Sequence, residues 1–483
     1  MFSFTLRTPL SKYLKTLRSA SMMPPRKAFF VILHGIMAKA KEKHTKKTTR
    51  GSKAPALTVR ATFPTGFLWF LLLAAFLTLM SLPILTDRVA ENPTLSSALL
   101  APLAIWGVTA LLAFWFSRPT RFNGDRSFIV LTLLLFGLGV VEQLRLQSFQ
   151  LTWEVWRAYI PMLSGAVGFL FCLRFLTARH LERLLSWRLL KWGLWIGMMG
   201  ILGALFCFGR SYRGGMFLPG QINPTELIKI AAVLLGATAL PPLKEHLSRH
   251  LCGLPFPSLS ALIQLAFFWG IPLVGVIFVR DLGLVLILCL TFVAMLASLT
   301  RNPLWLLLGV GGAVGAGFAI CQVSAHTAAR FAIWQNPFYD PLGKGYQILQ
   351  SLCAMNAGGL FGAGLNRGMP GSVPIVTSDF VYAAIAEEWG LAGCALLLLI
   401  YFLWLRAIFR NASTATAPTL RLASLGIGAV LSVQIILNVG GVTKALPMTG
   451  ITLPFLSHGG FSLLTVFLLC GLVAALSNRP QQK

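Results

Sequence analysis

The chain has 483 residues, of which 56% are hydrophobic and only 11% are charged. A soluble globule of this length needs more polar side chains to cover its surface, so the composition excludes a soluble protein and predicts an integral membrane protein. The 8 cysteines show no CxxC or CxxH spacing, which argues against a disulfide framework and a thiolate metal site.

The excess of positive charge is concentrated near the N-terminus. The net charge is +27, and residues 1–60 carry nine Lys, five Arg and one Glu without apolar periodicity. Such a segment is typical of a disordered cytoplasmic tail beside anionic lipid headgroups. We therefore expect a membrane surface, and not nucleic acid, as the partner of this tail.

Apolar runs of roughly 17–25 residues are long enough to cross a bilayer as helices. The sequence predicts an all-α, polytopic bundle with about 12 transmembrane helices, in a range of 10 to 12. The runs cover residues 66–85, 97–117, 127–146, 158–176, 190–208, 225–241, 259–279, 282–299, 303–321, 380–404, 422–440 and 460–477.

Loop charge predicts the orientation of this bundle, because Lys and Arg favour the cytoplasmic side. With the N-terminus inside, each cytoplasmic loop is net positive, the C-terminus is also inside, and the long loop 322–379 between the ninth and tenth spans faces out. As a set, the cations left on the outer side favour binding of a phosphate group, whereas any single one could pair with a nearby acid, as Arg280 could with Asp281. These cations are Arg210, Arg213, Arg280, Arg330, Lys344, Arg367 and Lys444.

Acidic residues are rare except in one segment. Four of the 14 Asp and Glu residues (Asp340, Asp379, Glu387 and Glu388) fall within residues 336–388, which otherwise interrupt an apolar sequence. We expect functional chemistry in this segment, because ionisable groups near or inside a membrane are costly.

Five separated segments resemble motifs of the family of FtsW, RodA and SpoVE, the polytopic proteins of bacterial cell-wall synthesis. They occur in the family's order between about residues 210 and 477. They are NPTELIKI (223–230), VRDLGLVL (279–286), NPFYDPLGKGYQILQSL (336–352) followed by GGLFGAGL (358–365), SDFVYAAIAEEWGLAG (378–393) and LPMTGITLPFLSHGGFSLL (446–464). The departures from the family pattern include Asn223, Thr225, Leu284, Ile375, His458 and Phe461.

The resemblance implies a peptidoglycan glycosyltransferase in the bacterial inner membrane. Such an enzyme joins lipid II units into a β-1,4 glycan on the outer face and releases undecaprenyl diphosphate. The resemblance also implies a class B penicillin-binding transpeptidase and other division or elongation proteins as partners. The expected domains are N-terminal helices over 61–210, a catalytic core over 211–477 and a tail over 478–483.

A diphosphate leaving group needs neutralised charge and no general acid, so one carboxylate acting as base beside several cations would be sufficient. Asp340 is predicted as this base, because the resemblance places it at the family's essential loop aspartate; the alternative is a turn or capping Asp. Asp379 is the second candidate, with a helix N-cap as the alternative of equal weight.

The other predicted site residues are assigned to substrate binding. Glu387 and Glu388 could line a cavity or hold helices together, and Glu226 with Lys229 is expected first as a helical ion pair. The glycines at 358, 359, 362 and 364 indicate close packing and not a nucleotide loop. The remaining candidates are Arg330, Lys344, Tyr346, Gln347, Arg367, Lys444, Ser457 and His458.

Two alternatives and a cofactor stay open. A lipid II flippase would also use broken helices and intramembrane acids, and a structural scaffold would need no catalytic carboxylate. A divalent cation, Mg²⁺ or Mn²⁺, could help to neutralise the diphosphate, although the sequence contains no dedicated ligand cluster. The motifs do not separate a role in division from one in elongation.

Overall fold

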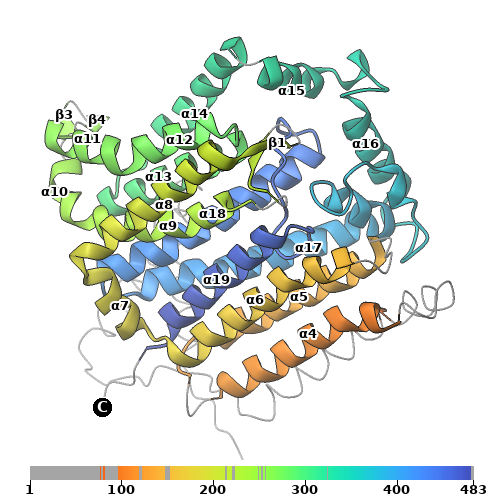
Figure 1. The fold of residues 1–483 in the computed structure, drawn as a ribbon, viewed down its shortest axis with the longest axis horizontal. Coiled ribbons are helices and arrows are strands. Elements are labelled where there is room, and N and C mark those ends of the chain that lie inside the picture. The colour runs from red at the N-terminus through yellow and green to blue at the C-terminus, as the bar shows by residue number, and fades with distance from the viewer. Residues whose placement is uncertain are drawn as a thin grey trace, which may run out of the picture. The chain divides into compact units, whose positions relative to one another are not determined.

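The helices of this computed structural model are drawn in chain order in Figure 1. The described residues are 77, 80, 81 and 96–479, apart from 119–121, 147–152, 213–214, 220–222, 249, 252–253, 256 and 324. The basic tail expected over 1–60 and most of the first expected span, 66–85, lie outside the described residues, as does Arg213.

The first half of the described chain is built from long apolar helices. Except for the short and charged α7, these helices are apolar, so each can bury its backbone polar groups internally and expose apolar side chains to lipid. These helices are α4 (Ser96–Phe116), α5 (Arg126–Leu146), α6 (Trp153–Phe175), α7 (Ala178–Ser186), α8 (Arg188–Phe208) and α9 (Thr225–Ala239).

The second half contains the remaining helices and the long loop. The main apolar helices are α11 (Leu259–Leu265), α12 (Ile271–Phe278), α13 (Leu282–Thr300), α14 (Leu304–Val323), α17 (Val381–Thr414), α18 (Pro418–Val442) and α19 (Gly460–Ser477). Short elements are η2 (Pro241–Leu243), α10 (Lys244–Leu247) and the π-turn η3 (Ala266–Gly270). The expected outer loop folds into α15 (Ala325–Gln335), η4 (Pro337–Tyr339), α16 (Tyr346–Gly358) and η5 (Pro370–Ser372).

The described part of the chain has seven helices that are long and apolar enough to span a membrane, or up to nine when two bent pairs are each taken as one span. Two shorter apolar helices, Leu100–Phe116 and Leu304–Gly315, accompany them. The all-α membrane bundle is therefore present, while the total of about 12 spans and their orientation stay predictions.

Three local expectations differ from the structure. The span expected over 380–404 is a longer helix that ends at Thr414, because Ala and Ile continue the helical pattern past Arg406 and Arg410. The expected cytoplasmic loop after α6 contains α7, which is bent by 98° from α6 and buries Leu181 and Leu185. Two small antiparallel hairpins also occur, β1 (Arg210–Tyr212) with β2 (Gly215–Phe217) and β3 (His250–Leu251) with β4 (Leu254–Pro255).

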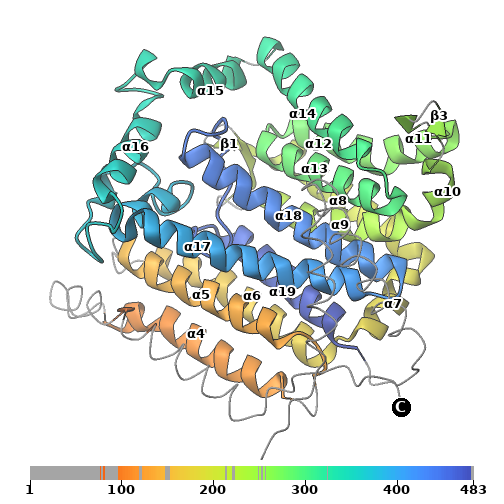
Figure 2. The ribbon, with the colours of Figure 1, turned by 180° about the vertical axis from the view of Figure 1, so that it is seen from behind.

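Aromatic packing joins the first and last helices of the bundle. Helix α6 packs along α19, and α5 packs against α4 and α17, as Figure 2 shows from behind. Phe136 of α5 meets Phe467 of α19 edge to face, with ring centroids 4.8 Å apart. Trp404 of α17 donates a hydrogen bond to Thr132 of α5 at 2.9 Å. These contacts fix α5 beside the helix that follows the long loop.

The two ends of α5 meet different parts of the chain. At its start, Asp125 pairs with Arg410 near the end of α17, and the Asn123 amide donates to Asn478 at 3.2 Å. At its other end, Gln143 donates to the carbonyls of Thr377 and Leu456. The segment that leads into α17 is therefore held at the opposite end of α5 from the C-terminus.

Candidate functional site

A cluster of polar residues forms where α9, α13, α15 and α17 begin or end. Lys229 donates hydrogen bonds to Glu226 at 2.7 Å and to Gln434 at 3.2 Å. The expected ion pair between Glu226 and Lys229 is thus confirmed, and Lys229 is only 2% exposed. We call this group the Asp379 cluster. It consists of Glu226, Lys229, Asp281, Arg330 and Asp379.

Asp281 connects α9 to α13 within this cluster. Its carboxylate caps α13 by accepting from the Leu284 amide at 3.0 Å, and it also accepts from the Thr225 hydroxyl at 3.3 Å. Burial raises the pKa of Asp281, and the nearby Glu226 carboxylate raises it further. Among the described residues Asp281 makes no ion pair with Arg280, so that possible pairing is not formed.

Arg330 of α15 brings a guanidinium to the same place. It donates to the Thr449 carbonyl at 3.3 Å. Burial lowers its pKa, while the carboxylates of Asp379 and Asp281 favour its charged form. Asp379 is half-buried at the start of α17, accepts from the Ser378 hydroxyl at 2.8 Å, and has its backbone carbonyl held by Asn438 at 3.0 Å. The Asp379 carboxylate is therefore near enough to the Arg330 guanidinium to favour its charged form.

Asp340 has different surroundings. It is exposed, and its two carboxylate oxygens accept from the backbone amides of Gly343 at 3.0 Å and Lys344 at 2.9 Å. Its own carbonyl accepts from the Gly345 amide at 2.9 Å. Within the described residues no hydrogen bond or ion pair joins Asp340 or Lys344 to the Asp379 cluster. The carboxylate of Asp340 thus organises its own turn.

The remaining candidates lie at three places. Lys344, Tyr346 and Gln347 are around the start of α16, Arg367 is exposed on the turn after α16, and Lys444 is half-buried after α18. Ser457 is buried and donates to the Ser378 carbonyl at 2.5 Å, which makes it a support for the chain beside Asp379. His458 is exposed, and its backbone amide donates to the Thr377 carbonyl at 2.7 Å.

Glu387 and Glu388 bind parts of the protein. Glu388 pairs with Arg145 of α5 at 2.5 Å and accepts from the Gly368 amide at 3.1 Å. Glu387 accepts from the Met369 amide at 2.8 Å. Glu387 and Glu388 were expected either to line a cavity or to hold helices together. These contacts support the structural role.

Several polar residues of the site were not among the predicted residues. Glu142, Gln143 and Arg145 lie in the expected span 127–146, where an acid and an arginine three positions apart are themselves a signal of an intramembrane polar site. Asp281 belongs to the motif VRDLGLVL (279–286), but it was not among the predicted site residues. Asn438 gave no signal in the sequence, because an isolated amide in an apolar helix has many structural explanations.

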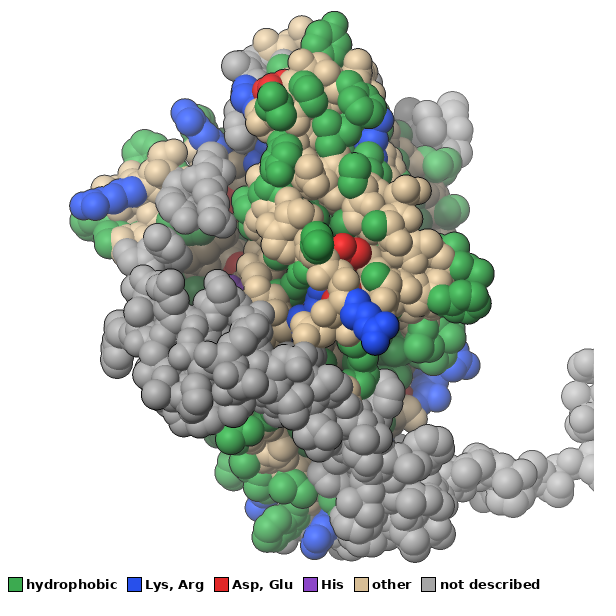
Figure 3. Space-filling model, turned by 90° about the vertical axis from the view of Figure 1, so that its right-hand side faces the viewer, with side chains coloured by type: hydrophobic (Ala, Val, Ile, Leu, Met, Phe, Trp, Pro, Cys, Tyr) green, Lys and Arg blue, Asp and Glu red, His purple; other side chains and the backbone are tan. Residues whose placement is uncertain are grey.

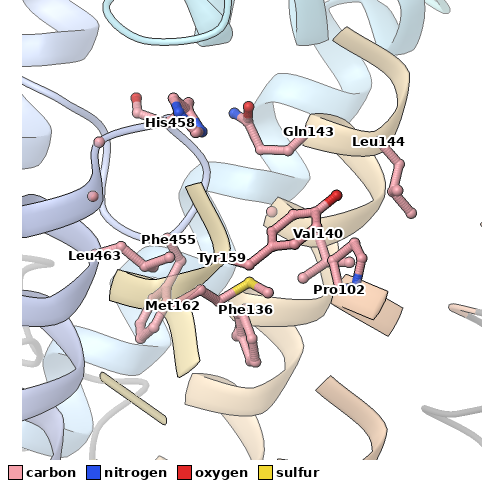
Figure 4. Close-up of a pocket in the computed structure, with 14 residues that line it drawn as sticks. Pro102, Phe136, Val140, Gln143, Leu144, Tyr159, Met162, Phe455, His458 and Leu463 are labelled. Atoms are coloured by element: carbon pink, nitrogen blue, oxygen red, sulfur yellow. The ribbon is translucent and has the colours of Figure 1, made fainter. Parts of the chain in front are cut away.

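A small pocket lies close to Thr377, because two of its lining residues, Gln143 and His458, donate hydrogen bonds to the Thr377 carbonyl. It lies between α4, α5, α6 and the loop before α19. Figure 4 shows Gln143 and His458 near one another at one end and apolar side chains such as Met162 and Phe136 away from them. The lining also includes Pro102, Val140, Leu144, Tyr159, Phe455 and Leu463.

The surface toward which α16 projects is mixed in character. Figure 3 views the molecule from that side, and Lys and Arg side chains stand there with a few acidic ones among hydrophobic and uncharged residues. Exposed apolar side chains on the described loop include Phe338, Tyr339 and Leu342. This surface is suited to the boundary between lipid and water.

The fold and the polar site define a class of protein: a polytopic helical membrane protein with an ionisable cluster beside an apolar pocket. A family model described as "Cell cycle protein" (FTSW_RODA_SPOVE) matches residues 125–482. The chain therefore belongs to the family of FtsW, RodA and SpoVE.

Sequence relatives agree with this assignment. The peptidoglycan glycosyltransferase RodA of Mycobacterium tuberculosis is 32% identical over 303 residues, covering 60% of this chain and 65% of the relative. Stage V sporulation protein E of Bacillus subtilis is 27% identical over 394 residues, covering 79% of this chain and 94% of the relative. The chain thus spans about two thirds of the length of the mycobacterial RodA protein.

Solved structures share the fold. A chain from a peptidoglycan synthase complex that coordinates polymerization and crosslinking aligns with a TM-score of 0.59 and 26% identity, over 74% of this chain and 99% of that chain. The crystal structure of Thermus thermophilus RodA aligns with a TM-score of 0.52 and 23% identity, over 74% and 98%. Helix α4 precedes the residues that the family model matches.

Proposed function

We propose that this protein is a peptidoglycan glycosyltransferase that polymerises lipid II into β-1,4 glycan strands on the outer face of the bacterial inner membrane. Undecaprenyl diphosphate is the released product. The observation that carries the proposal is the half-buried Asp379 carboxylate beside Arg330, with Lys229 in the same cluster. Membership of the family and the names of its relatives supply the substrate class.

The reaction needs a base and a place for developing negative charge. The attacking hydroxyl of one sugar loses a proton as it bonds to the anomeric carbon of the donor, and the bond to the diphosphate breaks. We assign Asp340 as the group that takes the proton, with Asp379 as the second candidate, and Arg330 and Lys229 as cations that stabilise the departing diphosphate. No acid is needed, because a diphosphate leaves as a stable anion.

Asp340 is proposed as this base because it stands, in the segment NPFYDPLGKGYQ, where the family has its essential loop aspartate. It is exposed on the predicted outer loop, and the Gly343 and Lys344 amides fix the direction in which its carboxylate points. Asp379, in the same cluster as Arg330, is the second candidate for the base and otherwise contributes to substrate binding.

The pocket between α4, α5 and α6 suits the polyprenyl chain of the substrate. Its apolar lining would hold isoprene units, and its polar end near Gln143 and His458 adjoins residues 377–379. A chain bound there would bring its diphosphate-linked sugar toward Asp379.

A divalent cation and a protein partner complete the proposal. In the described residues no three His, Cys, Asp or Glu side chains converge on a metal position. In this proposal a Mg²⁺ or Mn²⁺ ion would come with the diphosphate and not be held by a cage of described side chains. A class B transpeptidase is the proposed partner, because a similar chain occurs in a peptidoglycan synthase complex. A role in division or in elongation fits equally well.

The experiment is polymerisation of fluorescent lipid II by purified protein, alone and with its transpeptidase partner. We expect glycan strands, with one polyprenyl diphosphate released per bond formed. The absence of strands in the presence of the partner would contradict the proposal.

A lipid II flippase is the second candidate, because α17 is broken at Gly390 and two other helix pairs are bent. Vesicles that contain the protein and labelled lipid II separate the two functions. Movement of the label between leaflets without polymer would favour the flippase, whereas polymer without faster movement favours the transferase.

A further inference from the structure

One helical turn of α5 contacts both ends of the segment that precedes Asp379. Gln143 donates to the Thr377 carbonyl at 3.0 Å, two residues before Asp379. Arg145 pairs with Glu388 at 2.5 Å, and Glu388 in turn accepts from the Gly368 amide at 3.1 Å. The chain from Gly368 to Thr377 is thus attached to the same turn of α5 at each end.

The Arg145 side of this arrangement is buried and rich in acids. Glu142, Glu387 and Glu388 are 2%, 7% and 2% exposed, and Arg145 is 4% exposed. Arg145 also pairs with Glu142 at 3.0 Å. A single guanidinium cannot neutralise three carboxylates, so the acids need further partners in this apolar region.

Backbone amides of the turn after α16 supply those partners. Gly368 and Asn366 donate to Glu388, and Met369 donates to Glu387 at 2.8 Å. Asn366 has a positive φ of 61°, which helps successive amides to point the same way, as in an anion-binding nest. If the turn moved away, the buried carboxylates would lose these bonds with no water to replace them.

A break in α17 strengthens the same attachment. Gly390 has φ 65° and ψ −170°, so the helix loses hydrogen bonds there. The loop after α16 replaces them: the amides of Ala363 and Gly364 donate to the Glu387 and Glu388 carbonyls at 2.9 and 3.1 Å. The amides of Leu391 and Ala392 donate back to the Gly359 and Leu360 carbonyls, both at 3.0 Å.

We propose that Arg145 and Glu388 form a lock that holds the turn at residues 364–369 against α17 and thereby positions Asp379. They are positioning residues, since the contacts described for them join α5, α17 and the turn after α16. Arg145 acts through Glu388, and Glu388 acts through the Gly368 amide. The effect on turnover rests on the proposed function, whereas the lock itself does not.

The test uses trypsin, because Arg367 is exposed within the locked turn and is followed by Gly368. The variants are Glu388→Gln, which removes the charge that Arg145 holds, and Arg145→Lys, which lacks the planar fork that serves two carboxylates. The matched control is Glu142→Gln, which alters the same ion pair but has no bond to the turn. Cleavage is read as appearance of a fragment that begins at Gly368, in folded protein in detergent.

We expect cleavage after Arg367 to be about tenfold faster in Glu388→Gln, with a smaller increase in Arg145→Lys and little change in Glu142→Gln. In lipid II polymerisation we expect kcat to fall about tenfold in Glu388→Gln with KM nearly unchanged, because the pocket and the cations remain. Unchanged cleavage in the folded variants would overturn the lock. If Glu388→Gln does not fold, Arg145→Lys decides.

The two proposals fail in different ways. A wild-type protein that makes no polymer, but whose variants still show faster cleavage, contradicts the transferase and leaves the lock standing. Normal polymerisation in a variant with faster cleavage would show that the lock does not position Asp379.

Discussion

Lys229 is a cation buried in the Asp379 cluster, where it bonds Glu226 and Gln434. Lys229→Met should abolish most polymerisation, by about 100-fold, and should also destabilise the protein because Glu226 is left unpaired. The double variant Glu226→Gln with Lys229→Met removes both charges of this ion pair. We therefore expect its melting temperature to recover while its activity stays low. Recovery of both in the double variant would show that the ion pair is only structural.

Asp281 offers a test of the pH dependence of stability. Because burial raises its pKa, the folded state holds a proton on this carboxyl more readily than the unfolded chain does. The ionised form therefore costs folding free energy above the raised pKa, and this cost disappears as the pH falls. Asp281→Asn keeps a cap for Leu284 and should raise the melting temperature by about 1–3 °C at pH 8, with a smaller gain at pH 4.

The control for this comparison is Asp340→Asn, since Asp340 is exposed and lies outside the cluster. The quantity compared is the change in melting temperature from wild type to Asp281→Asn at each pH. A smaller gain at pH 8 than at pH 4 would contradict a raised pKa of Asp281 in the folded protein.

Prediction at the residue scale succeeded where contacts are local. Glu226 and Lys229 are three apart on one helix, so their pair follows from helical spacing alone. The relation of Asp379 to Arg330 could not be predicted in this way, because the two residues are 49 positions apart and α16 lies between them in the chain. The motif around Asp340 predicted a catalytic role for it, but the sequence could not show that its carboxylate accepts hydrogen bonds from two backbone amides.

Helix α17 is the element on which the site most depends, and glycines allow its contact with the loop after α16. A Cβ built on Gly362, which has φ +82°, would lie 1.9 Å from the Glu388 carbonyl oxygen. Gly362→Ala should therefore lower the free energy of unfolding by about 1–3 kcal/mol and increase cleavage at Arg367. Gly371→Ala is the control, because nothing lies within 4 Å of its Cβ. Equal stability of the two variants would contradict the close packing.

Elements were predicted where an apolar run sufficed. Every expected run from 97–117 onward overlaps a helix or a pair of consecutive helices. The break at Gly390 was not predicted, because it is stabilised by amides and carbonyls of a loop that is 26 to 31 residues earlier in the sequence. The apolar-run criterion predicts a loop over α7, because this helix carries a charged face and only Ala178, Leu181 and Leu185 are buried.

In the molecule as a whole, Gln143 connects the pocket to the chain before Asp379, because it lines the pocket and donates to the Thr377 carbonyl. If the pocket holds a polyprenyl chain, Leu463→Trp should fill it and raise KM for lipid II with a full-length chain by about tenfold, with less effect on a short-chain analogue. Leu396→Trp is the control, since Leu396 is 54% exposed on α17. An equal change in KM for both chain lengths would contradict the assignment.

The overall architecture follows from composition, whereas the site needed the fold. Apolar runs and loop charge are enough to predict a helical membrane protein, because the bilayer permits few other solutions. The site brings together residues from α5, α9, α13, α15 and α17, and no periodicity of one segment reports such long-range contacts. The sequence signals of the lock were the charged pair Glu142 and Arg145 within an apolar run and the two acids Glu387 and Glu388 within another.

The central claim is that the Asp340 carboxylate is the base of glycan polymerisation, and the most direct measurement is the initial rate of lipid II polymerisation by Asp340→Asn and Asp379→Asn, each with its melting temperature. We expect Asp340→Asn to lose at least about 1,000-fold in rate while folding normally, and Asp379→Asn to lose less, because Asp379 contributes to binding and not to proton transfer. A folded Asp340→Asn variant that polymerises lipid II like the wild type would contradict the account.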